Sequence, residues 1–202
     1  MLKPAFLSAL FVCLSSAQNA PVKEIELPGE PGLYAIIDTS MGTMVAKLYE
    51  DKAPNTVKSF VDLAEGAKPS MTRAGQLTKH PYYNGLLFHR VVKGFMIQTG
   101  DVRGTGSGNC GIPNLKDEID KNLNFNAPGV LAMANTGKPN TAACQFFITV
   151  APAPYLKGQY TVFGHIVSGQ YVADNISTVP TLSTERPMGN IVLKSITIKR
   201  KQ

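Results

Sequence analysis

The first regular pattern along the chain is a pair of apolar runs separated by a turn signal. The stretch YAIIDTSMGTMVAKLY, residues 34–49, holds two apolar runs on either side of Ser40, Met41 and Gly42. Small and flexible residues between two such runs are typical of a β-hairpin turn. The pattern therefore predicts a hairpin as the first element.

The pattern changes to helical spacing in the next stretch, APNTVKSFVDLAEG. Its apolar residues recur every three or four positions, Pro54 stands where a helix accepts proline in its first turn, and Gly66 is a suitable stop. A helix is therefore expected between Pro54 and Gly66. The polar, turn-rich residues 67–85 that follow predict a long surface loop.

Short apolar runs bounded by glycine, proline, asparagine or aspartate occupy much of the remaining chain. They predict strands in LLFHRVV, FMIQTG, GVLAMA, QFFITV and YTVFGHIV. Residues 169–177 have helical spacing, and residues 190–200 alternate as a strand does. Many short strands with two helices are typical of an antiparallel barrel or sandwich, not of a parallel βαβ sheet. No repeat or second domain is visible, so residues 32–202 are expected to form one domain.

The first residues have the features of a cleavable export signal. Lys3 supplies a positive charge, residues 5–14 form an apolar run too short to cross a bilayer, and small residues at 15–17 precede a cleavage position after Ala17. We therefore predict a signal peptide over residues 1–17.

Two other interpretations of the N-terminus are weaker. One is a buried N-terminal helix, and the other is a lipoprotein signal ending at Cys13, which the bulky Val12 disfavours. Residues 18–31 contain proline and glutamate and are expected to form a flexible leader. Because no other stretch is long and apolar enough to span a membrane, the mature protein is expected to be soluble and either periplasmic or secreted.

Composition supports a single globular domain, since the 202 residues are 44% hydrophobic and 17% charged. The formal net charge is +6, but the basic residues are scattered, and the largest cluster is Lys199-Arg200-Lys201. Such a tail is usually solvated, so the charge does not favour a binder of nucleic acid or membrane surfaces. A monomer is the default expectation.

Candidate chemistry outside the signal peptide is sparse. Cys110 and Cys144 are either a disulfide, which an oxidising compartment would permit, or two unpaired thiols, and the sequence leaves both open. The histidines are isolated and lack metal-site spacing, so His89 and His165 are interpreted as hydrogen-bonded structural residues. Neither a metal nor a cofactor is expected.

A glycine pattern at residues 106–111 resembles a nucleotide-binding motif only superficially. GSGNCG matches G-x-G-x-x-G, but Ile112-Pro113-Asn114 is a poor helix start and no βαβ unit surrounds it. We therefore interpret these glycines as flexible loop residues.

A lone arginine, Arg90, interrupts the apolar stretch FHRVVKGFMIQTGD, residues 88–101. A guanidinium does not lose its charge, so its uncompensated burial would be very unfavourable. Arg90 therefore either faces solvent or lines a pocket in which its charge has a use.

Three stretches can be compared together: FHRVVKGFMIQTGD (88–101), GVLAMANTGKPNTAACQFFIT (129–149) and YLKGQYTVFGHIVSG (155–169). Their order and spacing resemble the cyclophilin family of peptidyl-prolyl cis-trans isomerases over about residues 33 to 200. The loop before Tyr82 resembles that of bacterial-type members. The resemblance implies a mainly β fold, a closed eight-stranded antiparallel barrel capped by two α-helices, with substrate bound in a groove outside the barrel.

The resemblance also implies which residues act. Arg90 and Gln98 correspond to the catalytic arginine and the glutamine near it. The implied substrate-binding residues are Phe95, Met96, Ala134, Asn135, Gln145, Phe147, Tyr155, Leu156 and Tyr160. Taken singly, each would be interpreted as a solvated, packing or core residue, and only their joint order and spacing favours a site.

Two positions depart from the family pattern. Tyr155 stands where many members have tryptophan, and Tyr160 where many have histidine. The tyrosines still offer apolar area and a hydroxyl. We therefore expect isomerase activity to survive and the affinity for cyclosporin to be reduced.

The implied activity is faster rotation of X–Pro bonds in proline-containing polypeptides, during the folding of exported proteins. Rotation breaks no covalent bond, so it needs no nucleophile, metal or cofactor, but only a fixed donor that favours the twisted amide. The alternative is a non-catalytic chaperone or scaffold module that binds proline-containing segments.

Overall fold

The computed structural model describes residue 27 and residues 29–202. The predicted signal peptide and most of the predicted leader lie outside the described residues. The end of that leader contacts the domain, because Glu30 forms an ion pair of 2.7 Å with Lys47, and its carbonyl accepts a hydrogen bond from the Tyr34 hydroxyl.

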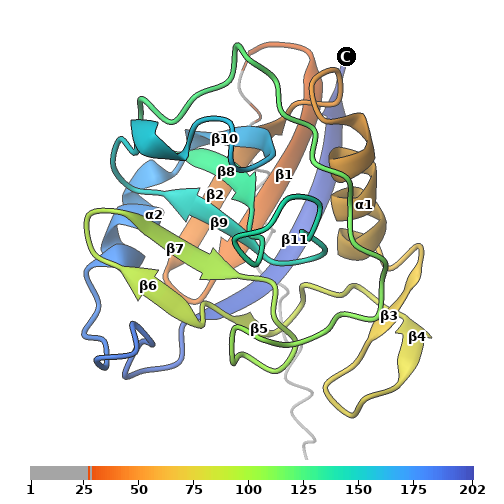
Figure 1. Ribbon diagram of the computed structural model, residues 1–202, viewed down its shortest axis with the longest axis vertical. Helices are drawn as coiled ribbons and strands as arrows, with labels where there is room; N and C mark the ends of the chain where they lie inside the picture. Colours follow the sequence, from red (N-terminus) through yellow and green to blue (C-terminus); the bar gives the residue numbers. More distant parts are fainter. Residues whose placement is uncertain (1–26, 28) are drawn as a thin grey trace, which may run out of the picture.

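Strands dominate the described chain, and most of them join one sheet (Figure 1). The strands are β1 (Gly32–Thr39), β2 (Gly42–Leu48), β3 (Pro69–Met71), β4 (Leu77–Lys79), β5 (Leu86–Leu87), β6 (Arg90–Val92), β7 (Met96–Thr99), β8 (Val130–Met133), β9 (Phe146–Thr149), β10 (Val162–Ser168) and β11 (Val192–Lys201). The helices are α1 (Pro54–Ala64), α2 (Gln170–Ser177) and a short 3-10 turn, η1 (Pro154–Leu156). α1 and α2 lie at opposite ends of the curled sheet, on the right and on the left of Figure 1, and both bury residues in the main core. No helix among these residues is long and apolar enough to cross a membrane.

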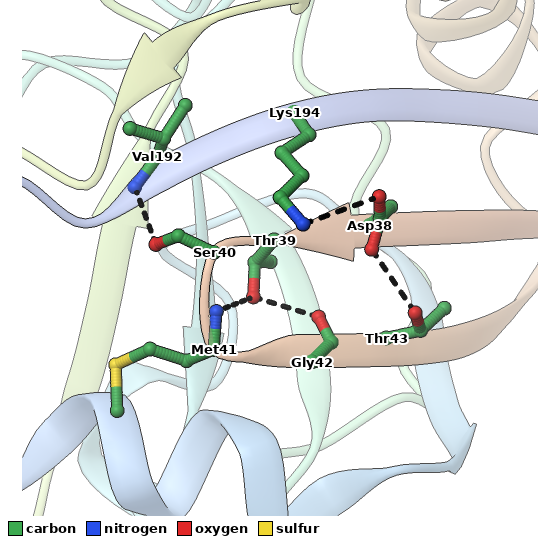
Figure 2. Close-up of polar contacts among 8 residues, drawn as sticks. All are labelled: Asp38, Thr39, Ser40, Met41, Gly42, Thr43, Val192 and Lys194. Carbon is green, nitrogen blue, oxygen red and sulfur yellow. Dashed lines mark hydrogen bonds and ion pairs between the residues drawn. The ribbon is translucent and has the colours of Figure 1, made fainter. Parts of the chain in front are cut away.

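The predicted hairpin is present as β1 and β2. Thr39 holds its turn, because the Thr39 hydroxyl donates to the Gly42 carbonyl at 2.7 Å and accepts the Met41 N–H at 3.0 Å (Figure 2). Ser40 ties the turn to β11, since its hydroxyl accepts the Val192 N–H at 3.0 Å (Figure 2). The turn thus fixes the register of β1, β2 and β11.

The first helix begins and ends where the sequence predicts. Pro54 stands in the first turn of α1, and Gly66 follows its C-terminal end with a φ of +71°, a left-handed conformation that glycine adopts easily. The helix buries Phe60 against the rings of Tyr83 and Phe163, each at a centroid distance of 5.1 Å. These rings join α1 to the main core of the domain. The second helix, predicted over residues 169–177, is confirmed as α2.

The sheet is open, which corrects the expected closed eight-stranded barrel. Within the described residues its strand order is β5-β11-β1-β2-β10-β8-β9-β7-β6, so nine strands form one curled sheet whose end strands are not paired with each other. The run LLFHRVV, predicted as one strand, is divided between the end strands β5 and β6, with only Phe88 and His89 between them. A loop covers the outer edge of β6, where the Val91 N–H donates to the Glu185 carbonyl at 2.7 Å. One apolar run therefore supplies both edges of the sheet instead of one strand that closes it.

The long loop predicted over residues 67–85 is also corrected, because β3 and β4 pair within it as a separate two-stranded sheet. Gly75, with a φ of +82°, lies in the turn between them, and its N–H donates to the Thr72 carbonyl at 2.9 Å. The two strands are three residues each, and β4 is exposed along its length. Such short polar strands give little periodic signal in the sequence.

Cys110 and Cys144 are joined by a disulfide in the structure, with their Cα atoms 6.4 Å apart. The bridge connects the long segment after β7 to the residues just before β9. Tyr82 packs at the same place, because its hydroxyl donates to the Gly100 carbonyl at 3.0 Å and lies 3.4 Å from the Cys144 Sγ. Tyr82 therefore holds the start of the segment after β7, and the disulfide holds Cys110 further along it to the residues before β9.

Reduction of the disulfide should increase the mass of the denatured protein by that of two hydrogen atoms and lower its stability. Because the bridge links residues that are 34 positions apart, the free energy of unfolding should fall by about 3–4 kcal/mol. Intact-mass spectrometry and urea unfolding, each with and without a reductant, measure the two effects. No change in mass on reduction would mean that the two thiols are free.

Candidate active site

The alternation of side chains along neighbouring strands builds the site. In β9, Phe146 belongs to the main core, whereas the next residue, Phe147, belongs to a second apolar cluster. In β7, Ile97 and Met96 divide in the same way. Because successive residues of a strand point to opposite faces, the second cluster lies on the outer face of the sheet. It forms an apolar floor outside the main core.

Cross-strand pairing aligns the polar site residues with this floor. Arg90 of β6 lies opposite Gln98 of β7, Gln98 lies opposite Phe147 of β9, and Phe147 lies opposite Ala132 of β8. Residues directly opposite each other in antiparallel strands share a face. Arg90 and Gln98 therefore project from the same face as Phe147, one strand apart from each other.

This face carries a cavity of about 380 Å³, at the small end of ligand-binding pockets. Except for Gln145 and Tyr155, the predicted site residues line it together: Arg90, Phe95, Met96, Gln98, Ala134, Asn135, Phe147, Leu156 and Tyr160. Gln145 lines an adjoining cavity of about 350 Å³, which shares Gln98 and Asn135 with the first. The structure therefore brings together residues that are up to 70 positions apart in the sequence (90 to 160).

The floor of the cavity is apolar and its rim is aromatic. The buried floor residues are Met96, Phe147 and Leu156. The Tyr160 ring meets the Phe147 ring edge-on, with a centroid distance of 5.4 Å. Tyr155 is 63% exposed and stands at the rim, its ring centroid 6.0 Å from that of Phe95. The cavity is thus an apolar pocket, open to solvent, that is large enough for a small ring.

Hydrogen bonds connect the arginine to the rest of the site. Arg90 Nη1 donates to Gln98 Oε1 at 3.4 Å, and Gln98 Nε2 donates to Gln145 Oε1 at 2.9 Å. Gln145 Nε2 donates in turn to the Gly106 carbonyl at 3.0 Å. The Arg90 side chain is 42% exposed, so its charge stays hydrated while it borders the apolar floor. Arg90 is tolerated among apolar residues because it lines the wall of a pocket.

Glu185 also contacts this arginine and was not predicted from the sequence. Arg90 Nε donates to Glu185 Oε2 at 2.6 Å, which is shorter than its bond to Gln98. Glu185 lies 95 residues further along the chain, in a polar segment without periodic pattern, so no local signal connects the two. Other unpredicted residues that line the cavity are His89, Thr105, Gly106 and Thr184.

The glycine-rich loop after β7 borders both cavities and is folded around a carboxylate. Asp101 accepts the backbone N–H groups of Arg103, Thr105, Gly106 and Gly108 at 2.6–3.1 Å. Burial alone would raise the pKa of Asp101, but these hydrogen bonds favour its charged form and the pKa is lowered. The amides that would face a phosphate in a nucleotide-binding loop here face a side chain of the same protein.

The two histidines interpreted as hydrogen-bonded structural residues differ. His165 Nδ1 lies 2.6 Å from the Tyr49 hydroxyl, which confirms the interpretation for His165. His89 is 7% exposed at the cavity, and its ring faces the Leu87 backbone and the Gln145 side chain, although neither contact is a well-aligned hydrogen bond within the described part of the chain. The structural interpretation of His89 therefore stays a prediction. Burial lowers the pKa of His89, because the imidazolium would lose its hydration.

Comparisons with known proteins place this chain in a family. Residues 34–198 match the family model of the cyclophilin type peptidyl-prolyl cis-trans isomerases. The chain is 41% identical over 158 residues to peptidyl-prolyl cis-trans isomerase-like 1 of Aspergillus fumigatus, covering 77% of this chain and 89% of that protein. It is 40% identical over 171 residues to peptidyl-prolyl cis-trans isomerase B of Streptomyces anulatus, covering 83% and 97%.

A solved structure supports the same assignment. The crystal structure of a cyclophilin type peptidyl-prolyl cis-trans isomerase of Cryptosporidium parvum, in the presence of the dipeptide Ala-Pro, has a TM-score of 0.72 and 31% identity, covering 83% of this chain and 99% of that one. The chain therefore belongs to the cyclophilin-type peptidyl-prolyl cis-trans isomerases. The enzyme class that the sequence resemblance implied is confirmed.

The stability of the protein should decrease as the pH falls below about 6.5, partly through His89. The pKa of His89 is lowered in the folded state, so the unfolded chain takes up a proton first, and protonation favours unfolding. Urea unfolding at pH 8 and at pH 5 measures the slope, which should become shallower in a His89→Phe variant. An unchanged slope in that variant would contradict the assignment to His89.

Proposed function

We propose that Arg90 is the catalytic residue of this isomerase and that the adjacent cavity holds the proline ring of a polypeptide substrate. The observation that carries the proposal is the row of Arg90, Gln98 and Phe147 across three paired strands, which places a permanent charge beside an apolar floor. Ala-Pro is the dipeptide of the similar Cryptosporidium structure, and it supports proline-containing polypeptides as the substrate class.

The chemistry of the X–Pro bond explains why this arrangement suffices. Resonance between the nitrogen lone pair and the carbonyl gives a rotation barrier of about 18–20 kcal/mol. In the twisted transition state the prolyl nitrogen regains its lone pair and becomes an acceptor. A donor fixed beside that nitrogen stabilises the twisted amide more than the planar one, and this difference is what accelerates the reaction.

The guanidinium of Arg90 can supply such donors. Its Nε–H is used by Glu185 and one Nη1–H by Gln98, while the remaining N–H bonds have no acceptor within the described residues. Because the guanidinium is planar and rigid, the free donors keep a fixed direction relative to the bound ones. We assign to them the prolyl nitrogen and the substrate carbonyl, and to Gln98 the support of Arg90.

The substrate would lie across the cavity with its ring on the apolar floor. The residues assigned to the ring are Phe95, Met96, Phe147, Leu156 and Tyr160. The Ala134 N–H already donates to the Gln145 carbonyl at 2.9 Å, so we assign pairing with the substrate backbone to the other main-chain groups of Ala134 and Asn135. Gln145 and its adjoining cavity would receive a residue before the proline.

The aromatic rim bears on inhibitor binding. Tyr155 presents one ring, mostly exposed, where tryptophan would present two fused rings. Less apolar area would be buried by a large ligand, and each 25 Å² lost removes roughly 0.6 kcal/mol. We therefore expect cyclosporin to bind with reduced affinity. We also expect a monomer that does not bind nucleic acid.

The setting we infer is the folding of exported proteins in the periplasm or outside the cell. The export-signal pattern at residues 1–17 supports it, and so does the disulfide between Cys110 and Cys144, since such bonds persist in oxidising compartments. Bacterial-type relatedness, suggested by the loop before Tyr82, is part of the same proposal.

Replacement of the catalytic arginine tests the proposed mechanism. Arg90→Ala should lower kcat/KM for a proline-containing peptide by about 10²–10³-fold, because a fixed transition-state donor is lost. A protease-coupled isomerisation assay measures the rate, with and without cyclosporin. Arg200→Ala is the matched control, since Arg200 is also an exposed, ion-paired arginine but lies outside both cavities. Wild-type rates in Arg90→Ala would remove the proposed role.

The same assay separates the enzyme from a non-catalytic binding module. A chaperone or scaffold would bind proline peptides without accelerating their isomerisation. The purified wild-type domain should accelerate it. Binding without acceleration would leave only the non-catalytic function for this cavity.

Export can be tested independently of catalysis. When the full chain is expressed in a bacterial host, the mature protein should be found outside the cytoplasm and its N-terminal sequence should begin at Gln18. Leu10→Arg interrupts the apolar run and should leave the chain uncleaved in the cytoplasm. Cytoplasmic, uncleaved wild-type chain would contradict the export proposal and leave the isomerase activity untouched.

A further inference from the structure

We propose that Glu185 is a positioning residue for catalysis, which holds the Arg90 guanidinium in the orientation that the reaction needs. The proposal rests on the catalytic role of Arg90 argued above. It assigns a function in the site to the loop of residues 179–191, for which no role was predicted from the sequence.

The contact with Glu185 is the stronger of the two that anchor the guanidinium. Arg90 Nε and Glu185 Oε2 are 2.6 Å apart and both groups are charged, whereas Gln98 is neutral and its oxygen is 3.4 Å from Nη1. Charge-assisted hydrogen bonds are shorter and about twice as strong as neutral ones. Glu185 therefore does more than Gln98 to fix the plane of the guanidinium.

Fixing that plane matters because an arginine side chain has many rotamers. Arg90 is 42% exposed, so packing alone does not hold its end. Without an anchor, the N–H donors of Arg90 would point toward the substrate only part of the time. The entropy cost of ordering the side chain would then add to the activation barrier. An anchor on Nε leaves both terminal nitrogens available to a substrate.

Several hydrogen bonds hold the loop that carries Glu185 in place beside Arg90. The Glu185 carbonyl accepts the N–H of Val91, the residue next to Arg90, at 2.7 Å. The Glu185 N–H donates to the Leu182 carbonyl at 2.9 Å, and Arg186 Nη1 donates to the Gly104 carbonyl at 2.9 Å. The carboxylate is therefore carried by a segment that is fastened both to β6 and to the glycine-rich loop across the site.

The backbone of Glu185 is in an unfavourable conformation, which argues against a purely structural role. Its φ is +63°, a left-handed value that costs a residue with a long side chain about 1–2 kcal/mol and that glycine or asparagine would adopt more easily. Its side chain is 44% exposed, and an ion pair between exposed groups contributes little to stability. Glutamate at this position is therefore explained by its contact with Arg90 better than by the stability of the fold.

Two substitutions separate positioning from folding. Glu185→Asn and Glu185→Gly both remove the charge and the reach of the side chain while they suit the positive φ. Each should leave the melting temperature unchanged or raise it, and each should lower kcat/KM by about tenfold, mainly through kcat, because the interaction matters most in the transition state. Asparagine keeps the loop stiffer than glycine does, so equal losses in both variants exclude loop flexibility as the cause. A loss in Glu185→Gly with wild-type activity in Glu185→Asn would overturn the proposal.

A third variant and a control isolate the charge. Glu185→Gln keeps the length and the acceptor oxygen, so its activity should lie between those of the wild type and of Glu185→Asn. Glu50→Gln is the matched control, because Glu50 also pairs with an arginine, at 2.8 Å, and is 42% exposed. It should keep wild-type kcat/KM within about twofold. In nuclear magnetic resonance spectra, the Arg90 Nε–H signal should be well resolved in the wild type and broadened or shifted in Glu185→Asn.

A double-mutant cycle with Arg90→Ala decides whether Glu185 acts through the arginine. In the Arg90→Ala background, Glu185→Asn should change the residual activity by less than about twofold. An equal tenfold loss in both backgrounds, or wild-type activity in Glu185→Asn itself, would overturn the positioning role. Full activity of Arg90→Ala would instead overturn the catalytic role of the arginine, so the two failures are distinguishable.

Discussion

The two-residue repeat of the β-strand is the constraint on which the site depends. It sends Phe146 into the main core and Phe147 onto the outer face, and cross-strand pairing then places Gln98 and Arg90 beside Phe147. A shift of one residue in the pairing would exchange the two phenylalanines between core and pocket. The same strand pairing therefore determines which residues are buried in the core and which line the pocket. A change in that pairing would disrupt both.

Because the sheet is open, a loop covers its edge at β6, and this loop forms one wall of the site. A sheet edge exposes unpaired backbone groups and needs a cover. Here a loop covers the edge of β6, with the Glu185 carbonyl on Val91 and the Glu185 carboxylate on Arg90. On the other side, Asp101 and the disulfide at Cys110 hold the glycine-rich loop in place. Both walls are loops fixed by polar or covalent contacts, while the floor between them is fixed by packing.

The balance of charge and apolar surface suits a reaction without covalent chemistry. Arg90 stays about two-fifths exposed, so its charge is not fully desolvated, yet it borders an apolar floor that would exclude water from one side of the proline ring we propose to bind there. A difference of 1.4 kcal/mol between planar and twisted amide is already tenfold in rate. A few well-aimed donors are therefore enough for the isomerisation that defines this family, and this is why their orientation matters more than their number.

Local pattern determined the hairpin, both helices and most strands, because apolar spacing and turn residues such as Pro54 and Gly66 are local signals. The order and spacing of the motifs also predicted that Arg90 and the aromatic residues belong to one site. Only the tertiary structure decided that the run from Leu86 to Val92 supplies both edges of an open sheet, since nothing within it marks a break. Only the tertiary structure placed Glu185 on Arg90, because a contact across 95 residues is made by the path of the chain and not by any neighbouring residue.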